Sequence, residues 1–452
     1  MKIETNSKLV KPGDTFVALT GVHYDGHDFI DEAIQNGAQK IIGEKKLNIK
    51  DVKYKQVKSA RKYLTKICAK ENKILTKNMK IIAITGTKGK STTAMITYEL
   101  LKKANYKVAY IGTLGLYYEN SFEKLENTTP DILALNKIFK KLVNKKITHV
   151  IMEISSHSLV EKRIKGLKFT IAAFTNFSQD HLDYHLNMQN YFKAKMQIFK
   201  YLEGIMVVNN DDEKAKEIIH KTKKYVTIGT NGDFKINDYK LYIAHTLVNF
   251  EYHYNHFTVA TRLVGKHNIY NYLMAIAICI NQGIDIYDLI NYTNNIKNVK
   301  GRNELIKASK GYAIIDYAHS PSAVLETLKT YNELKKNRII TIIGCGGQRD
   351  KTKRPIMGQI AVENSDFVIF TSDNPRDENP LEILKDITGN LVKKNYEVIE
   401  NRSLAIKKGV KLLQKDDYLL ILGKGHEDYQ IIKNIKYHFD DKEEVLKNIK
   451  HG

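Results

Sequence analysis

Cysteine and long apolar runs are both scarce in this sequence. Its three cysteines, Cys68, Cys279 and Cys345, lie far apart, which argues against a disulfide framework or a cysteine-based zinc site and fits a reducing cytoplasm. No apolar run approaches the roughly 20 residues that a membrane-spanning helix needs. The first residues lack the apolar stretch of a signal peptide. We therefore expect a cytoplasmic protein that does not insert into membranes.

Acidic residues are in the minority. Lys and Arg number 72 and Asp and Glu 50, which gives a formal net charge of +22. A nucleic-acid partner would explain such an excess. We favour a general compositional preference, because the lysines are spread along the whole chain and aromatic residues do not alternate with them as stacking platforms would. The hydrophobic share of 42% excludes a disordered chain.

The length of 452 residues corresponds to three domains at about 150 residues each. We place them at residues 1–78, 79–298 and 299–452. The elements expected in the first unit are a strand at 14–19, a helix at 29–36, a strand at 40–43 and a lysine-rich linker at 70–80.

The second and third units alternate continuous apolar runs with helical stretches. This alternation predicts an α/β fold whose parallel sheets are covered on both faces. Ligands of such sheets bind at the carboxyl ends of the strands. The expected strands are 81–84, 148–152, 169–174 and 205–208 in the second unit, and 313–315, 339–343, 367–370 and 418–422 in the third.

A glycine-rich loop follows the first strand of the second unit. It reads Thr85-Gly86-Thr87-Lys88-Gly89-Lys90-Ser91-Thr92 and leads into a helix. Glycines let backbone N–H groups surround phosphate oxygens, Lys90 can reach the outer phosphates, and the Ser91 hydroxyl can bind Mg²⁺. The general P-loop motif has an earlier glycine where this chain has Ile84, so the match to that motif is incomplete.

Further motifs follow this loop in a fixed order, and the whole set resembles the Mur ligases, the ATP-dependent amide-bond ligases of peptidoglycan synthesis. The resemblance covers nearly the whole chain and is closest to the members that add a diamino acid at the third step. The motifs lie at residues 127–130, 152–157, 175–185, 265–268, 301–304, 316–319, 344–350, 373–376 and 423–427.

The resemblance implies a three-domain ligase. A small α/β domain holds a UDP-sugar, a central domain holds ATP and Mg²⁺, and a Rossmann-like C-terminal domain brings the amino acid. The implied substrates are UDP-N-acetylmuramoyl-L-alanyl-D-glutamate and meso-diaminopimelate, joined by phosphorylation of the carboxylate and displacement of phosphate by the amine. The resemblance also implies a monomer that closes around its ligands.

The resemblance supplies the catalytic and metal residues as well. Lys90 acts on the phosphates, and the implied metal ligands are Ser91, Glu153, His181 and Lys195, the last as a carbamate. Without the resemblance, Glu153 could equally form a salt bridge at a strand end, and His181 and Lys195 could be ordinary surface residues. A carbamate would replace the repulsion between an ammonium and Mg²⁺ with two oxygen ligands.

The remaining implied contacts belong to ATP and to the UDP-sugar dipeptide. For ATP they are Gly86, Thr87, Lys88, Gly89, Lys90, Ser91, Thr92, Asn268, Arg302 and Asp316, with His319 in an interdomain cluster. For the UDP-sugar dipeptide they are Ser7, His23, Asn127, Thr128, Thr129, Ser155 and Arg163. The two threonines could also cap the helix that follows Pro130.

The third unit carries the implied amino-acid pocket. Its residues are Arg349, Asp373, Asn374, Pro375, Arg376, Gly423 and Glu427. Asp-Asn-Pro alone is good turn chemistry, but it does not explain Arg376, which can hold the second carboxylate of diaminopimelate through two hydrogen bonds. Glu427 can take the distal ammonium. Lysine and lanthionine remain alternative amino acids.

Two positions depart from the family pattern. Lys8 stands where the family usually has Arg, which keeps the charge but removes the guanidinium fork next to the uridine contacts implied near Ser7. Glu161 replaces a family Gln and adds a negative charge to a site for anionic ligands.

Three other kinds of protein share some of these features: a nucleic-acid-dependent ATPase, a related ligase and a non-catalytic binding module. A nucleic-acid-dependent P-loop ATPase would explain the net charge and the loop, but not the motifs at 180–181, 316–319 and 423–427. Folylpolyglutamate synthase and the Mur ligase that adds D-Ala-D-Ala share the loop, but the residues at 373–376 argue against both. A non-catalytic binding module would not need the phosphate loop together with candidate metal ligands.

Overall fold

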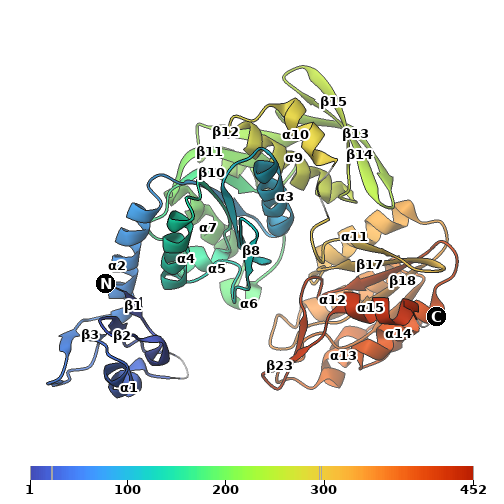
Figure 1. Ribbon diagram of the computed structural model, residues 1–452. Coiled ribbons are helices and arrows are strands. Elements are labelled where there is room, and N and C mark those ends of the chain that lie inside the picture. Colours follow the sequence, from blue (N-terminus) through green and yellow to red (C-terminus); the bar gives the residue numbers. More distant parts are fainter. Residues whose placement is uncertain (1, 22–23, 295, 297, 451–452) are drawn as a thin grey trace.

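A computed structural model describes residues 2–450 except 22, 23, 295 and 297. It contains three α/β units in series (Figure 1). The small first unit and the third unit lie at opposite ends of the central one, and helix α2 leads from the first unit into the central unit. The predicted fold class is confirmed. The exact boundaries at 78/79 and 298/299 stay predictions.

The first unit is a four-stranded parallel sheet in the order β1-β2-β3-β4. Its elements are β1 (Ile3–Glu4), β2 (Thr15–Val17), α1 (Ile30–Gln35), β3 (Lys40–Gly43), β4 (Lys53–Gln56) and α2 (Ala60–Leu75). The predicted linker at 70–80 is largely wrong, since α2 runs to Leu75 and the next strand begins at Lys80. Ser59 caps α2, and Leu64 and Cys68 bury its apolar face.

The central unit is built on an eleven-stranded sheet in the order β15-β14-β13-β12-β11-β10-β5-β9-β6-β7-β8. The six central strands, in the order β12-β11-β10-β5-β9-β6, pair in parallel, as predicted. These strands are β5 (Lys80–Thr85), β6 (Val108–Gly112), β9 (His149–Glu153), β10 (Phe169–Phe174), β11 (Leu202–Asn209) and β12 (Tyr225–Gly229).

Antiparallel arms extend both edges of this sheet. One is formed by β13 (Phe234–Tyr242), β14 (His245–Tyr252) and β15 (Asn255–Thr261), the other by β7 (Gly115–Tyr118) and β8 (Ser121–Glu123). Helices α3 (Lys90–Lys103) and α9 (Lys266–Ile280) bury one face, while α4 (Ile132–Asn144) and α7 (Met188–Met196) pack on the other. The shorter central helices are α5 (Ser156–Val160), α6 (Leu182–His185), α8 (Ala215–Ile219) and α10 (Ile286–Thr293).

The third unit is a six-stranded sheet in the order β16-β17-β21-β18-β19-β20. Its strands are β16 (Glu304–Lys307), β17 (Gly311–Asp316), β18 (Ile339–Ile343), β19 (Phe367–Phe370), β20 (Tyr396–Val398) and β21 (Asp417–Leu422). Only β16 pairs antiparallel. Its helices are α11 (Pro321–Leu334), α12 (Lys353–Asn364), α13 (Pro380–Thr388), α14 (Arg402–Leu412) and α15 (Asp441–Lys450), and a separate hairpin joins β22 (Tyr429–Ile432) to β23 (Ile435–His438).

Candidate active site

The phosphate loop lies at the carboxyl end of β5 and ends at the first turn of α3. Gly86 and Gly89 have φ angles of +137° and +79°, and a Cβ at either position would lie 1.9 Å from Thr175 Oγ1 or 2.2 Å from Asn271 Oδ1. Only glycine fits that backbone and that space. The loop therefore presents the N-terminus of α3, a favourable position for anions.

Two lysine ammonium groups bind backbone carbonyls of this loop. Lys90 Nζ donates to the carbonyls of Gly86 at 3.0 Å and Thr87 at 2.7 Å. Lys195, on α7, donates to the same Gly86 carbonyl at 2.7 Å and lies over the Tyr191 ring. Burial lowers the pKa of both ammonium groups, and for Lys195 the neighbouring Lys90 lowers it further, to well below 10.5. Lys195 is 1% exposed, so it is not an ordinary surface lysine.

Glu153 ends β9 and is fully buried beside the loop. It accepts hydrogen bonds from Ser91 Oγ at 2.9 Å, from the backbone N–H and hydroxyl of Thr113 at 3.0 and 3.1 Å, and from the Tyr110 hydroxyl. Within the described part of the chain, no Lys or Arg forms a salt bridge with Glu153. The structure therefore joins two of the four predicted metal ligands directly, Ser91 and Glu153.

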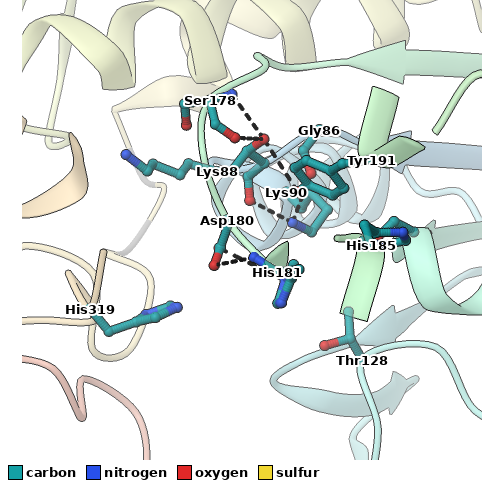
Figure 2. Close-up of polar contacts among 12 residues, drawn as sticks. Gly86, Lys88, Lys90, Thr128, Ser178, Asp180, His181, His185, Tyr191 and His319 are labelled. Carbon is teal, nitrogen blue, oxygen red and sulfur yellow. Dashed lines mark hydrogen bonds and ion pairs between the residues drawn. The ribbon is translucent and has the colours of Figure 1, made fainter. Parts of the chain in front are cut away.

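His181 lies on the loop between β10 and α6 with a left-handed backbone at φ +53°. Figure 2 shows it beside Asp180, below the phosphate loop, and the two side chains lie 3.8 Å apart. Its ring stacks edge-on against His157, with centroids 5.0 Å apart. Burial lowers the pKa of His181, although Asp180 opposes the shift. The neutral ring is the form that binds a metal.

Residues predicted for the UDP-sugar dipeptide lie next to Glu153. Thr129 Oγ1 donates to the Glu153 carbonyl at 2.8 Å and accepts from the Ser155 N–H at 3.0 Å, while Thr128 Oγ1 lies 3.0 Å from Thr113 Oγ1. Arg163 Nη1 donates to the Thr129 carbonyl at 2.8 Å. Four of the seven predicted residues, Thr128, Thr129, Ser155 and Arg163, thus form one cluster.

The other three lie elsewhere. Asn127 is exposed just before Thr128. Ser7 lies in the first unit, where its hydroxyl donates to Glu32. His23 lies outside the described residues.

Glu161 turns toward Arg163 and away from the rest of the cluster. Its Oε2 accepts from Arg163 Nε at 2.8 Å. The charge that departs from the family pattern is therefore neutralised by the neighbouring guanidinium, which is also held by the Thr129 carbonyl.

The third unit contacts the phosphate loop at Ser91 and Lys88, and it also contacts Ser178 in the segment after β10. Arg302 Nη2 donates to Ser91 Oγ at 3.4 Å while its guanidinium lies 4.4 Å from the centre of the Tyr317 ring. Lys88 Nζ donates to Ser322 Oγ at the start of α11, and Ser322 Oγ lies 3.4 Å from Ser178 Oγ. These contacts place the carboxyl end of β17 opposite that of β5.

The predicted residues Asn268 and Asp316 support neighbouring groups. Asn268 is buried and holds Asn271, whose Oδ1 accepts from the Thr93 hydroxyl in the first turn of α3. Asp316 accepts from the Asn303 N–H at 2.8 Å, and burial raises the pKa of this carboxyl group. His319 lies beyond Asp180 in Figure 2, and burial lowers the pKa of its ring to about 4.

The predicted amino-acid pocket forms at the carboxyl ends of β18, β19 and β21. Arg376 has a left-handed φ of +55°, and its Nη1 donates to the Gly347 carbonyl at 2.7 Å. Asn374 Nδ2 donates to Glu427 Oε2 at 2.8 Å, and Asp373 lies against Gly423, where a Cβ would be 2.7 Å from Asp373 Oδ2. Pro375 precedes Arg376 in this loop, and Arg349 is exposed next to it. Burial lowers the pKa of Arg376, and Arg349 lowers it further.

Sequence reasoning missed several residues of this site. Tyr110 and Thr113 bind Glu153, and Asn271 supports the loop from α9. Lys424 is fully buried within the amino-acid pocket. Only Lys424 carried a signal, because it lies inside the motif at 423–427.

The described residues contain neither a membrane-spanning helix nor a metal site of acidic, His or Cys side chains. No helix among them is both long and apolar enough to cross a membrane. No three His, Cys, Asp or Glu side chains in the same residues gather as a metal site. The metal set predicted from the sequence is of a different kind, since it includes a serine and a modified lysine.

Comparisons with known proteins match each of the three units to a domain of one family. Residues 2–84 match the description "Mur ligase family, catalytic domain", residues 84–279 "Mur ligase middle domain", and residues 301–425 "Mur ligase, glutamate ligase domain". This chain belongs to the Mur ligase family. It is therefore an ATP-dependent ligase, and the loop at 85–92 is explained without a nucleic-acid partner.

Individual relatives match over nearly the full length. UDP-N-acetylmuramoyl-L-alanyl-D-glutamate--2,6-diaminopimelate ligase of Clostridium botulinum is 39% identical, over 99% of this chain and 95% of the relative. A solved structure of an enzyme with that name is 30% identical, with a TM-score of 0.69 over 100% of this chain and 94% of that one. MurF ligase from Thermotoga maritima in complex with ADP shares the fold at a TM-score of 0.73, with 21% identity over 100% and 97% of the two chains.

Proposed function

We propose that this ligase adds meso-diaminopimelate to UDP-N-acetylmuramoyl-L-alanyl-D-glutamate with ATP. The observation that carries the choice of amino acid is Arg376, held by the Gly347 carbonyl close enough to Arg349 and Glu427 for both charges to affect its pKa. A cationic pair opposite a carboxylate suits an amino acid whose far end carries both a carboxylate and an ammonium. The enzymes named for this reaction match nearly the whole chain.

The reaction proceeds through an acyl phosphate. The glutamate carboxylate of the UDP-sugar attacks the γ-phosphorus, ADP leaves, and the amine of diaminopimelate then displaces phosphate to form the amide. Each step brings anions together, so positioned cations supply most of the catalysis. Lys90 and Lys88 from the loop and Arg302 from the third unit are the cations that the fold brings to this point.

The central site also suits Mg²⁺. Ser91 and Glu153 already lie 2.9 Å apart and offer oxygen ligands, and Lys195 contacts the Gly86 carbonyl of the same loop. When bound there, the ion would neutralise charge on the phosphates. To bind the ion, Glu153 would have to give up hydrogen bonds from Ser91 and Thr113 and coordinate the metal instead.

Lys195 suits carbamylation by CO₂. The free amine attacks the carbon of CO₂ and loses a proton, leaving a carbamate with one N–H and two oxygens. Burial and Lys90 favour the neutral amine at Lys195, and the remaining N–H could keep the bond to the Gly86 carbonyl. The modification would convert a buried cation into an anionic group that offers oxygen ligands to the metal.

The UDP-sugar would lie between the first unit and the cluster at Thr128–Arg163. Arg163 keeps Nη2 without a protein partner among the described contacts, while Nε and Nη1 are held by Glu161 and Thr129. We infer that Glu161 sets the direction in which Arg163 Nη2 points. We also infer that the chain acts as a monomer. The boundaries at 78/79 and 298/299 would be the hinges of closure.

Two substitutions of Glu161 distinguish the effect of its negative charge from the effect of its hydrogen bond to Arg163. Glu161→Gln keeps an acceptor for Arg163 Nε but removes the negative charge, so KM for the UDP-sugar should fall severalfold. Glu161→Ala frees the guanidinium, and KM should rise severalfold instead. Steady-state kinetics with ATP as the varied substrate serve as the control, since that KM should stay constant. Equal behaviour of the two variants would contradict this role.

Phosphate release tests the proposed reaction. The enzyme receives the UDP-sugar dipeptide and Mg-ATP with meso-diaminopimelate, L-lysine or lanthionine in parallel. Release with diaminopimelate far above the other two supports the proposal. Faster release with L-lysine would keep the ligase and overturn the role of Arg376. No release with any amino acid would overturn the choice of UDP-sugar.

A further inference from the structure

A buried lysine lies at the centre of the amino-acid pocket without an assigned role. Lys424 follows β21 and has no exposed surface. Its Nζ donates to Asn374 Oδ1 at 3.3 Å, to Glu427 Oε2 at 3.4 Å and to the Tyr429 carbonyl. An ammonium has three N–H donors, so each donor has an acceptor, and each acceptor belongs to a segment that lines the pocket.

The same ammonium connects the loop of Arg376 to the β22–β23 hairpin. Asn374 Oδ1 also accepts from the Ile431 N–H at 2.9 Å, and Ile431 in turn accepts from the Arg376 N–H at 3.0 Å. Lys424 holds Asn374 from one side and the start of the hairpin, at Tyr429, from the other. The position of Arg376 therefore depends on this network of hydrogen bonds, which contains Lys424 as its buried cation.

Electrostatics make Glu427 depend on this lysine. Burial raises the pKa of Glu427, and nearby Asp373 raises it further, while Lys424 and the hydrogen bond from Asn374 oppose the shift. Burying a carboxylate next to a second one favours protonation unless a cation compensates. The other charged or titratable groups that face Glu427 are Arg376, Arg402, Tyr317 and Tyr429. Among all these groups, only Lys424 forms an ion pair with Glu427.

We propose that Lys424 is a positioning residue for amino-acid selection, which keeps Glu427 ionised and aimed at the distal ammonium of a diamino acid. The inference rests on the proposed function and deepens it. A neutral Glu427 would offer the ammonium a weaker acceptor and could donate its own proton to Asp373. Lys424 would thus act on the substrate through Glu427 and Asn374 without touching it.

The test is the pH dependence of KM for meso-diaminopimelate in Lys424→Met. Methionine keeps the apolar stem and removes the charge. We expect the acid limb of the KM profile to move up by about one pH unit, so that KM on this limb rises about tenfold, because Glu427 then protonates at higher pH. KM for ATP should not change. A general loss of folding would lower the apparent kcat, because less of the enzyme is active, and would leave the acid limb where it is.

Three further single variants and one double variant sharpen the result. Lys436→Met is the matched control, because Lys436 is exposed, lies 5.0 Å from the centre of the Tyr429 ring and does not pair with Glu427; its profile should equal that of the wild type. Lys424→Gln removes the charge but keeps donors for Asn374, so it carries the test if the methionine variant does not fold. In Glu427→Gln the limb should disappear, and adding Lys424→Met should change KM much less than in the wild type.

The outcomes separate this inference from the proposed function. If the wild type does not use diaminopimelate at all, the proposed function has failed before Lys424 is tested. If the wild type uses it and Lys424→Met or Lys424→Gln keeps the wild-type acid limb, the inference is overturned while the proposed function stands. Additive effects of the Lys424 and Glu427 substitutions would overturn it as well.

Discussion

Replacing Lys195 by Ala should lower kcat about a hundred- to a thousandfold, the range typical for loss of a positioned electrostatic group in a phosphoryl- or acyl-transfer site. The variant loses a buried group that already contacts the loop through the Gly86 carbonyl. If Lys195 carries CO₂, it also loses two oxygen ligands. Added formate or acetate should then restore part of the rate, because a small carboxylate can occupy the space and supply an oxygen.

The matched control is Lys193→Ala on the same helix. Lys193 is exposed, whereas Lys195 is buried, so its loss should leave kcat unchanged. A ¹³C NMR signal from the wild type in ¹³C-bicarbonate, absent in the Ala variant, would identify the carbamate directly. Full activity of Lys195→Ala, or a loss that no carboxylate restores, would contradict the modification.

Replacing Arg376 by Ala should raise KM for meso-diaminopimelate about a hundredfold or more. Two charge-assisted hydrogen bonds contribute roughly 1.5–3 kcal/mol each, and each 1.36 kcal/mol corresponds to a factor of ten. The loss should also reduce discrimination against L-lysine, since the enzyme then has no partner for the second carboxylate. Competition assays with both amino acids measure this ratio.

ATP binding should stay intact in Arg376→Ala, because the described hydrogen bonds of Arg376 go to Gly347, Asn374, Ile431 and Lys433 and none goes to the loop at 85–92. Lys433→Ala is the control. The backbone N–H of Lys433 donates to the Arg376 carbonyl at 2.8 Å, and its side chain is exposed. Its KM for diaminopimelate should match the wild type. Arg376→Lys keeps one charge without the fork and should fall between the wild type and Ala. An unchanged KM in Arg376→Ala would place the amino acid elsewhere.

Local sequence patterns were sufficient where local forces decide the structure. The strand at 81–84, the glycines at 86 and 89 and the following helix were predictable, because the apolar run, the positive φ angles and the helix start act within a few residues. The linker at 70–80 was predicted wrongly because lysines were read as exposed loop. In the structure, Ser59 caps α2 and residues such as Leu64 bury one face of it while the lysines remain in solvent.

Long-range contacts were not predictable in the same way. β13, β14 and β15 pair as an antiparallel arm. An alternating pattern of apolar and polar residues predicts a strand, but it does not show with which other strand that strand pairs. The four donors around Glu153 come from β6, from the segment after it and from α3. No spacing along the chain shows that they converge.

The sequence alone determined the class of this protein, its phosphate loop and the motifs that resemble the Mur ligases, because residue types and short spacings encode them. Only the tertiary structure decided how Glu161 is compensated, that Lys195 is buried, and that Lys424 pairs with Glu427. Each of these depends on burial or on a partner brought close by the fold, since desolvation and ion pairing are properties of the packed chain.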